Sequence, residues 1–290
     1  PVMGAGSGAT GWGMSMVSTA VYEGNSITVN EWTNLGYDIT NAYKHISGGN
    51  PDIAGVVEGG TIRYSTTFSP GSAAVPVSQY DQWADAIVAS KYTLATGSAI
   101  TTNKGSKSFT GAWSSGLSTI VTVSFPSATA ARYFFNSGGQ IRFDSSRSGG
   151  SATPQNTAWT SLLSAAGTQS WGAVARPGEG VSVFQSSYYK TSNGFGRWYS
   201  TASSTPYGSN YFEIFAMSPG IADNSQGIAS QIQFGVNWTD AHVGIAGGPD
   251  QVDGTITLAV STLEASQVLV PVSAGSFSVV SPTVTINNIA

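Results

Sequence analysis

The two histidines, His45 and His242, are the side chains of this chain best suited to metal binding or to acid–base catalysis near neutral pH. His45 falls at the expected end of a helix and His242 in an expected loop. Neither has a second ligand at metal-binding spacing. The chain has no cysteine, which excludes disulfides, thiolate catalysis and zinc bound through sulfur. We therefore expect both histidines to be structural or surface residues.

Carboxylates offer two further kinds of chemistry. Asp250 and Asp253 flank the turn at Gly254, but Ca²⁺ takes about six to eight oxygen ligands, and an Asp-Gly pair before a strand is also an ordinary turn. Glycoside hydrolysis needs two carboxylates on one cleft, whereas the glutamates are scattered, and only Glu213 lies within an expected strand. We expect no catalytic residue, no metal and no cofactor.

Aromatic residues are the plentiful recognition material of this chain. Eight of them fall within the 25 residues from 188 to 212, namely Tyr188, Tyr189, Phe195, Trp198, Tyr199, Tyr207, Tyr211 and Phe212. Aromatic rings stack on sugars and supply much of the binding energy of protein interfaces. With Arg197 beside these rings, residues 194–199 are a candidate receptor- or partner-binding loop, and Arg197, Trp198 and Tyr199 are its candidate partner-binding residues. The alternative is that members of this cluster simply pack the core of a sheet.

Charge is scarce, which bears on partners. Charged residues make up 9% of the chain, against about 25% in average domains, so hydroxyl and amide groups must cover the surface. Such a surface suits packing against other subunits, because charge is depleted at the centres of interfaces; a secreted β protein with a neutral surface would show the same composition. The net charge of −4 argues against a nucleic-acid partner, which would need a basic face.

Nothing in the sequence predicts a membrane segment, since no run of about 18 apolar residues occurs. The first eight residues, Pro-Val-Met-Gly-Ala-Gly-Ser-Gly, lack the basic start and the apolar stretch of a signal peptide. If residue 1 is close to the true start, the protein is expected to fold and assemble in the cytoplasm.

Residues 1–105 are predicted to be an N-terminal arm followed by a helical attachment region. The glycine-rich stretch 1–27 carries few apolar anchors, Trp12 among them, and is expected to become ordered against another surface. A helix is predicted over 29–46, because Thr28 and Glu31 form a capping box and glycines 48 and 49 end it.

The apolar face of this helix carries further candidate partner-binding residues. Trp32, Leu35 and Ile39 recur at intervals of three or four residues and form one stripe. A second amphipathic helix is predicted over 79–90, after the capping pair Ser78 and Asp81. A short β segment is expected between them, over 61–68. Such helices bury their apolar faces against each other, against the β domain or against other copies. Trp12, Trp32, Leu35 and Ile39 are therefore candidates for binding a partner, with packing inside the subunit as the alternative.

Residues 106–290 are predicted to form a β-sandwich, because many short strands are joined by Gly- and Ser-rich turns. Two short helices are expected to cover a face or an edge of the sheet, over 127–137 and 157–166. The fold class is therefore mainly β with N-terminal helices. Alternating or β-branched runs predict strands over 117–125, 140–144, 181–184, 195–200, 211–218, 228–238, 253–262 and 276–286.

The segment 131–143, ARYFFNSGGQIRF, carries the most local information. Ser127 is placed to cap the helix, and Gly138 and Gly139 are expected to end it in the left-handed conformation. Because neighbouring helix positions point about 100° apart, Phe134 and Phe135 are not expected to be equally buried.

This segment, together with Asn156-Thr157-Ala158-Trp159 and Val252-Asp253-Gly254-Thr255-Ile256-Thr257, resembles a family of virion structural proteins of tailed bacteriophages, in particular T4-like phages. More weakly, the resemblance extends to Gly11-Trp12-Gly13 and to the helix around Trp32. It covers most of the chain, and its motifs are structural rather than catalytic.

The resemblance implies a non-enzymatic component of the tail, the neck or collar, or the fibre apparatus. Its partners would be other virion proteins and copies of itself, and it would fold in the host cytoplasm before assembly into the virion. The alternative is a carbohydrate- or receptor-binding adhesin module that contacts a host surface glycan. A third class, an enzyme acting on surface polysaccharide, lacks the paired carboxylates.

Overall fold

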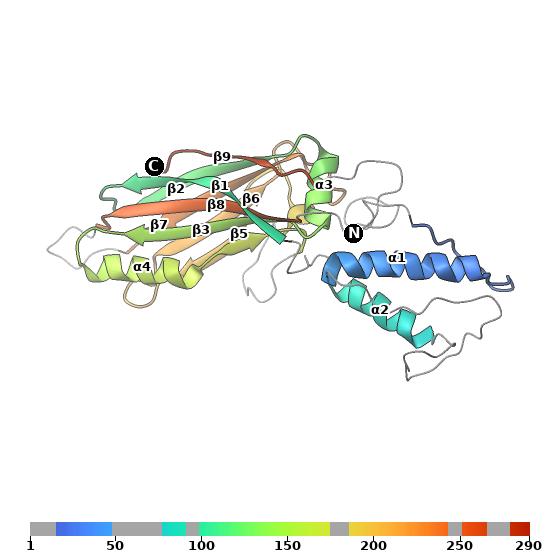
Figure 1. Cartoon of the computed structure of the whole chain (residues 1–290). Coiled ribbons are helices and arrows are strands. Elements are labelled where there is room, and N and C mark those ends of the chain that lie inside the picture. Colours follow the sequence, from blue (N-terminus) through green and yellow to red (C-terminus); the bar gives the residue numbers. More distant parts are fainter. Residues whose placement is uncertain (1–15, 48–76, 91–98, 175–185, 243–250, 266–278) are drawn as a thin grey trace.

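The structure is a computed structural model, and it shows a pair of packed helices beside a sandwich of two antiparallel sheets (Figure 1). The predicted fold class, mainly β with N-terminal helices, is confirmed. Trp12, Asp250 and the strands expected over 61–68 and 181–184 lie outside the described residues. Those described are 16–47, 77–90, 99–174, 186–242, 251–265 and 279–290.

The first helix, α1 (Val29–Ser47), begins as its capping box predicts. The Thr28 N–H donates to Glu31 Oε2 at 2.6 Å, and the Glu31 N–H donates to Thr28 Oγ1 at 3.3 Å. These two bonds satisfy backbone donors that the first turn leaves without a helical partner. Helix α2 (Val77–Ala89) begins two residues earlier than expected, so Ser78 lies inside it rather than ahead of it.

The two helices pack together around a small core of their own. Ile39 of α1 and Tyr80 of α2 are its buried members, and the Trp32 and Tyr80 rings meet edge to face at 5.2 Å. Leu35, Trp83 and Ile87 pack around them as partly buried side chains. This cluster is separate from the core of the sandwich, and Ile39 and Tyr80 are the only buried hydrophobic residues among those described in the two helices.

The sandwich has a four-stranded sheet in the order β1-β8-β3-β4 and a five-stranded sheet in the order β5-β6-β7-β2-β9, in which all neighbours are antiparallel. The strands of the first sheet are β1 (Ala99–Thr110), β8 (Thr255–Ala265), β3 (Gln140–Ser148) and β4 (Gln169–Trp171). Those of the second are β5 (Gly196–Ala202), β6 (Tyr211–Met217), β7 (Gln231–Thr239), β2 (Gly116–Ser124) and β9 (Thr283–Ile286).

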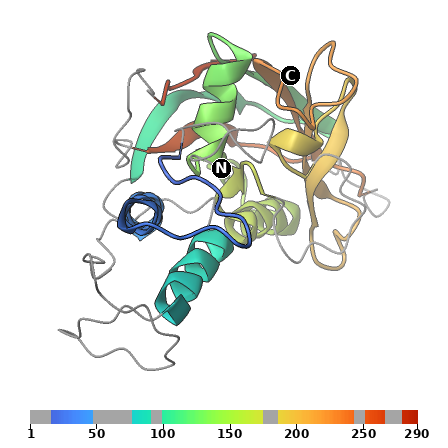
Figure 2. The ribbon, with the colours of Figure 1, turned by 90° about the vertical axis from the view of Figure 1, so that its right-hand side faces the viewer.

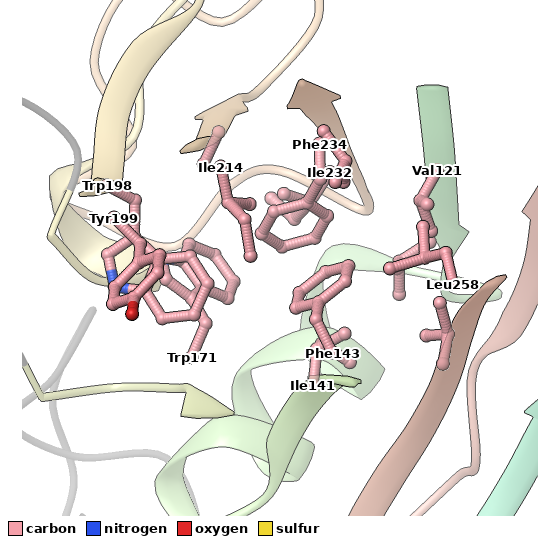
Figure 3. Close-up of a cluster of buried hydrophobic side chains, with 14 of the residues drawn as sticks. Val121, Ile141, Phe143, Trp171, Trp198, Tyr199, Ile214, Ile232, Phe234 and Leu258 are labelled. Atoms are coloured by element: carbon pink, nitrogen blue, oxygen red, sulfur yellow. The ribbon is translucent and has the colours of Figure 1, made fainter. Parts of the chain in front are cut away.

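The core lies between the two sheets, where inward-facing residues of both meet (Figure 3). Phe143 of β3 faces Phe234 of β7, with ring centroids 4.8 Å apart, and Trp171 of β4 meets the same Phe234 ring edge to face at 5.0 Å. Ile141 and Ile214 add aliphatic side chains from the two sheets, and all five side chains are buried. Buried and outer residues alternate strictly along β2, and along β7 they alternate except at Gly235, which is also buried. The opposite face of the five-stranded sheet therefore points away from the core.

Helix α3 (Ala128–Asn136) begins and ends nearly as predicted. Ser127 Oγ accepts from the Ala130 N–H at 3.1 Å. Gly138 has φ of +90°, as expected, but Gly139 does not lie in the left-handed region. Gly139 is required for a different reason: a Cβ there would lie 2.5 Å from the Phe134 carbonyl oxygen.

The expectation that Phe134 and Phe135 differ in burial is wrong, because both side chains are fully buried. Both rings contact Phe125, with centroids 5.3 Å and 5.6 Å away. Phe135 also stacks on Tyr188 at 4.3 Å, and Tyr188 belongs to the short 3₁₀ turn Tyr188–Lys190. This turn covers the side of the helix that would otherwise face solvent, so two neighbouring positions are buried together.

Helix α4 (Pro154–Ala166) begins three residues earlier than expected, with Thr153 as its cap and Pro154 in the first turn. It contacts β3 of one sheet and β5 of the other (Figure 1). Trp159 is buried against Trp113 at 5.0 Å. The helix therefore covers the side of the sandwich where the four-stranded sheet ends in β4, a strand of only three residues.

Candidate functional site

The trio Arg197, Trp198 and Tyr199 is divided between core and surface. Trp198 and Tyr199 are only 2% and 7% exposed and belong to the sandwich core, as Figure 3 shows. Arg197 lies on the outer face of β5, where its Nη1 pairs with Glu213 Oε1 at 3.1 Å. Of the three, only Arg197 is therefore placed to meet a partner in this structure.

The outer face of the five-stranded sheet carries two rows of side chains that run across the strands. Strand register places Phe215 of β6 beside Gly235 of β7, and Gly235 beside Ile120 of β2. Two residues further along the strands, the neighbouring row consists of Glu213, Asn237 and Ser118. An apolar row thus lies next to a polar one on the same face.

Phe195, just before β5, completes a groove on this face. Its ring is 47% exposed, and its Cε1 lies 3.6 Å from the position that a Cβ on Gly235 would take. The groove has a volume of about 290 Å³ and is lined by Ser118, Thr119, Ile120, Phe195, Phe215, Gly235 and Asn237. The sequence placed Phe195 in the candidate partner loop 194–199 and in an expected strand, whereas the side chains named as partner-binding were Arg197, Trp198 and Tyr199; the flanking Gly194 and Gly196 were the available signal for its exposure.

Along α1, the predicted stripe is only partly accessible. Ile39 is 9% exposed and lies in the small core, whereas Trp32 and Leu35 are half-buried. Residues 16–27 run beside α1 (Figure 2), held by Asp38, whose Oδ2 accepts from the backbone N–H and the hydroxyl of Ser18 at 2.9 Å and 2.6 Å. Between this segment and α1 lies an apolar groove of about 440 Å³.

This N-terminal module, residues 16–47 with 77–90, leaves many large apolar side chains in solvent. Tyr22 is 73% exposed and Val88 65% exposed. Elsewhere in the described chain such residues are fewer and scattered over the sandwich. The exposed apolar side chains of the module are Met16, Val17, Val21, Tyr22, Ile27, Tyr37 and Val88.

Asp253 lies in the turn that the sequence offers as a possible calcium site. Its carboxylate accepts hydrogen bonds from protein groups. Ser151 donates to it from its backbone N–H at 3.0 Å and from its hydroxyl at 2.9 Å, Asn156 donates from its side-chain amide, and Arg147 lies 3.5 Å away. The hydrogen bonds from Ser151, together with Asn156 and Arg147, lower the pKa of Asp253. These bonds join the loop before α4 to the start of β8, a structural role. Within the described ranges, no three His, Asp or Glu side chains gather as a metal site would need.

His242 is likewise explained by packing, since its ring meets Tyr207 at 4.7 Å and its backbone N–H donates to Asn210 Oδ1 at 2.9 Å. The side chain of His45 lies outside the described residues. No helix in the described ranges is long and apolar enough to span a bilayer.

Glu264 lies near the end of β8. Among the ion-paired carboxylates in the described part of the sandwich, its side chain is the least exposed. Its Oε1 lies 3.3 Å from Lys104 Nζ and accepts from the hydroxyls of Ser281, at 2.6 Å, and Thr262. Burial alone would raise the pKa of Glu264, but the hydrogen bonds and Lys104 outweigh it and lower the pKa below 4.5. The ionised form is therefore favoured in the folded state.

This cluster predicts an acid-dependent loss of stability. A carboxylate whose folded pKa is lowered stabilises the protein fully above its unfolded pKa, and the effect disappears as the pH falls through the folded value. Melting curves recorded from pH 7 downward should fall less steeply below pH 4.5 in Glu264→Gln than in the wild type. Asp223 and Asp253, whose pKa values are also lowered, leave the variant some acid sensitivity. Parallel curves for the two proteins would contradict the assignment.

The comparisons with known proteins add no relative: no protein family, no curated protein and no solved structure matches this chain. The resemblance to phage virion proteins therefore stays a prediction from the residues that carry it.

Proposed function

We propose that this protein is a non-enzymatic structural component of a tailed-phage virion, part of its tail, neck or collar, or fibre apparatus, and that it assembles with copies of itself and with other virion proteins. The observation that carries assembly is the apolar surface of the N-terminal module. The virion context rests on the resemblance and on the scarcity of charge.

The N-terminal module has too little core to account for its apolar residues. Ile39 and Tyr80 are its only buried hydrophobic residues among those described, whereas seven large apolar side chains on it face solvent. Units of this size bury a small fraction of their surface and need support from elsewhere. A neighbouring subunit that covered Met16, Tyr22 and Val88 would supply the missing burial, at roughly 25 cal/mol for each Å² of apolar surface removed from water.

The scarcity of charge supports the same role. A monomer with 9% charged residues has few ions with which to keep its surface dispersed in water. In an assembly, neighbouring copies cover part of that surface. The low charge of interface centres then becomes an advantage, because fewer ions have to be desolvated.

The proposal predicts self-association through the module. Sedimentation velocity over a range of concentrations should show an oligomer for the full chain and dissociation in the variant Met16→Ser/Tyr22→Ser/Val88→Ser, whose altered side chains are all more than half exposed. The control is Ile228→Ser, at a side chain on the sandwich with 53% exposure; this variant should associate like the wild type. A wild-type chain that stays monomeric throughout, or equal association of all three proteins, would overturn the proposed role of the module.

A further inference from the structure

We propose that the groove on the outer face of the five-stranded sheet, formed by Phe195, Phe215, Gly235, Asn237, Ser118 and Ile120, is a binding site for a neutral carbohydrate. The site lies on the sandwich and uses none of the residues of the N-terminal module. It therefore stands independently of the assembly role.

The apolar half of the site is shaped for the flat side of a sugar ring. Phe195 packs over Gly235, the one outer position of β7 that has no side chain. The hollow that remains is bounded by Phe215 and Ile120, its neighbours in the register row. The C–H face of a pyranose packs on an aromatic ring as other apolar groups do, and the exposed half of Phe195 gains burial when it is covered.

The polar half of the site offers hydrogen bonds that the protein itself does not use. Within the described chain, the Asn237 side chain makes no hydrogen bond, so its amide offers two donors and one acceptor. Ser118, beside it in the row, is exposed. Glu213 Oε1 accepts hydrogen bonds from Arg197 and from the Ser200 hydroxyl. Its Oε2 is left to accept one from a ligand hydroxyl. Ring hydroxyls, each both donor and acceptor, match this mixture of groups.

Charge and size point to a neutral sugar rather than to an anion or a protein. The ions bordering the groove, Arg197 and Glu213, pair with each other and leave no net charge for a phosphate or an acidic glycan. A volume of about 290 Å³ lies just below the range of small-ligand sites, about 300–1,000 Å³, and so fits one or two sugar rings rather than a large ligand. Specific protein interfaces bury about 800 Å² on each partner, far more than three apolar side chains provide.

The experiment uses the full chain on a glycan array that carries neutral hexose and N-acetylhexosamine oligosaccharides together with sialylated ones. Hits are then measured by calorimetric titration of the same oligosaccharides. Binding to neutral glycans is expected, and Phe195→Ala should weaken it by about tenfold or more, as truncation of a central aromatic contact does. Tyr211→Ala is the matched control, because Tyr211 is an exposed aromatic of the same sheet, at 38% exposure, and lies outside the groove.

A second variant tests the floor of the groove. In Gly235→Ala the new methyl group would make only ordinary contacts, with Phe195 at 3.6 Å and Phe215 at 3.8 Å, so the fold should be kept while the floor is raised and binding is lost. Thermal melts of both groove variants should match the wild type. The proposal is overturned if the wild type binds no neutral glycan, if it prefers the sialylated ones, or if Phe195→Ala binds as well as Tyr211→Ala.

Discussion

Phe134→Ala and Phe135→Ala are each expected to lower the free energy of unfolding by about 3–5 kcal/mol, the usual cost of truncating a buried phenylalanine. Both rings are fully buried, so each variant leaves a cavity. The Phe135 variant should be the more damaging of the two, because its ring also stacks on Tyr188 and meets Trp171 edge to face at 5.4 Å.

Urea denaturation of the two variants checks this expectation, and Phe195→Ala provides a control with the same chemical change. Phe195 is 47% exposed, so its truncation should cost less than about 1 kcal/mol. A near-neutral midpoint for either Phe134→Ala or Phe135→Ala would contradict the burial of that ring between α3 and the sandwich core.

Gly139→Ala is expected to destabilise the protein by about 1–3 kcal/mol or more, through overpacking. The added Cβ would lie 2.5 Å from the Phe134 carbonyl oxygen and 2.8 Å from its ring, distances that real Cβ atoms do not adopt. Since the obstacle is partly backbone, the turn between α3 and β3 would have to shift, and it would carry the buried Phe134 with it.

The matched control for this variant is Gly235→Ala, where the new methyl group would meet nothing closer than 3.6 Å. Neither glycine has a left-handed φ, so the two substitutions differ in the space available and not in backbone strain. Chemical denaturation should therefore separate the two variants clearly. Equal midpoints would mean that the turn at Gly139 relaxes freely.

Local signals in the sequence predicted the helices well. The Thr28–Glu31 pair and Ser127 form the capping bonds expected of them, because a cap depends on residues only three apart. Strands with regular alternation, such as β2 and β7, were also predicted close to their observed bounds. In both cases the information lies within one short window of the chain.

Elements defined by distant partners were missed or misplaced. Strand β1 has no alternation, and the run Asn103-Lys104-Gly105-Ser106-Lys107-Ser108 is polar throughout; it is a strand because it pairs with β8 along its whole length. It begins at Ala99 and so crosses the expected boundary between residues 105 and 106. Strand β4 is three residues long and is held by β3 alone.

The candidate site likewise depends on contacts between distant parts of the chain, which the sequence does not reveal. Trp198 and Tyr199 are adjacent, and ordinary alternation would place one ring on each face of the strand. A shift in register between Arg197 and Tyr199 buries both. The groove itself depends on Phe195, Phe215 and Gly235, which are brought together only by the pairing of β6 with β7 and by the path of the chain before β5. No spacing along the sequence contains that arrangement.

The irregularity in β1 bears on whether two copies of this chain can pair edge to edge. β1 is the outermost strand of its sheet, and an outermost strand with free backbone groups is a template for adding a strand from another molecule. The register shift between Asn103 and Gly105, with Gly105 at φ of +118° and its N–H bonded to Asn103 Oδ1 at 2.8 Å, breaks the straight ladder that such an addition needs. Exposed Lys107 would add like-charge repulsion between two such edges. Edge-to-edge stacking through β1 is thereby discouraged, so the self-association proposed above would have to use side-chain contacts instead.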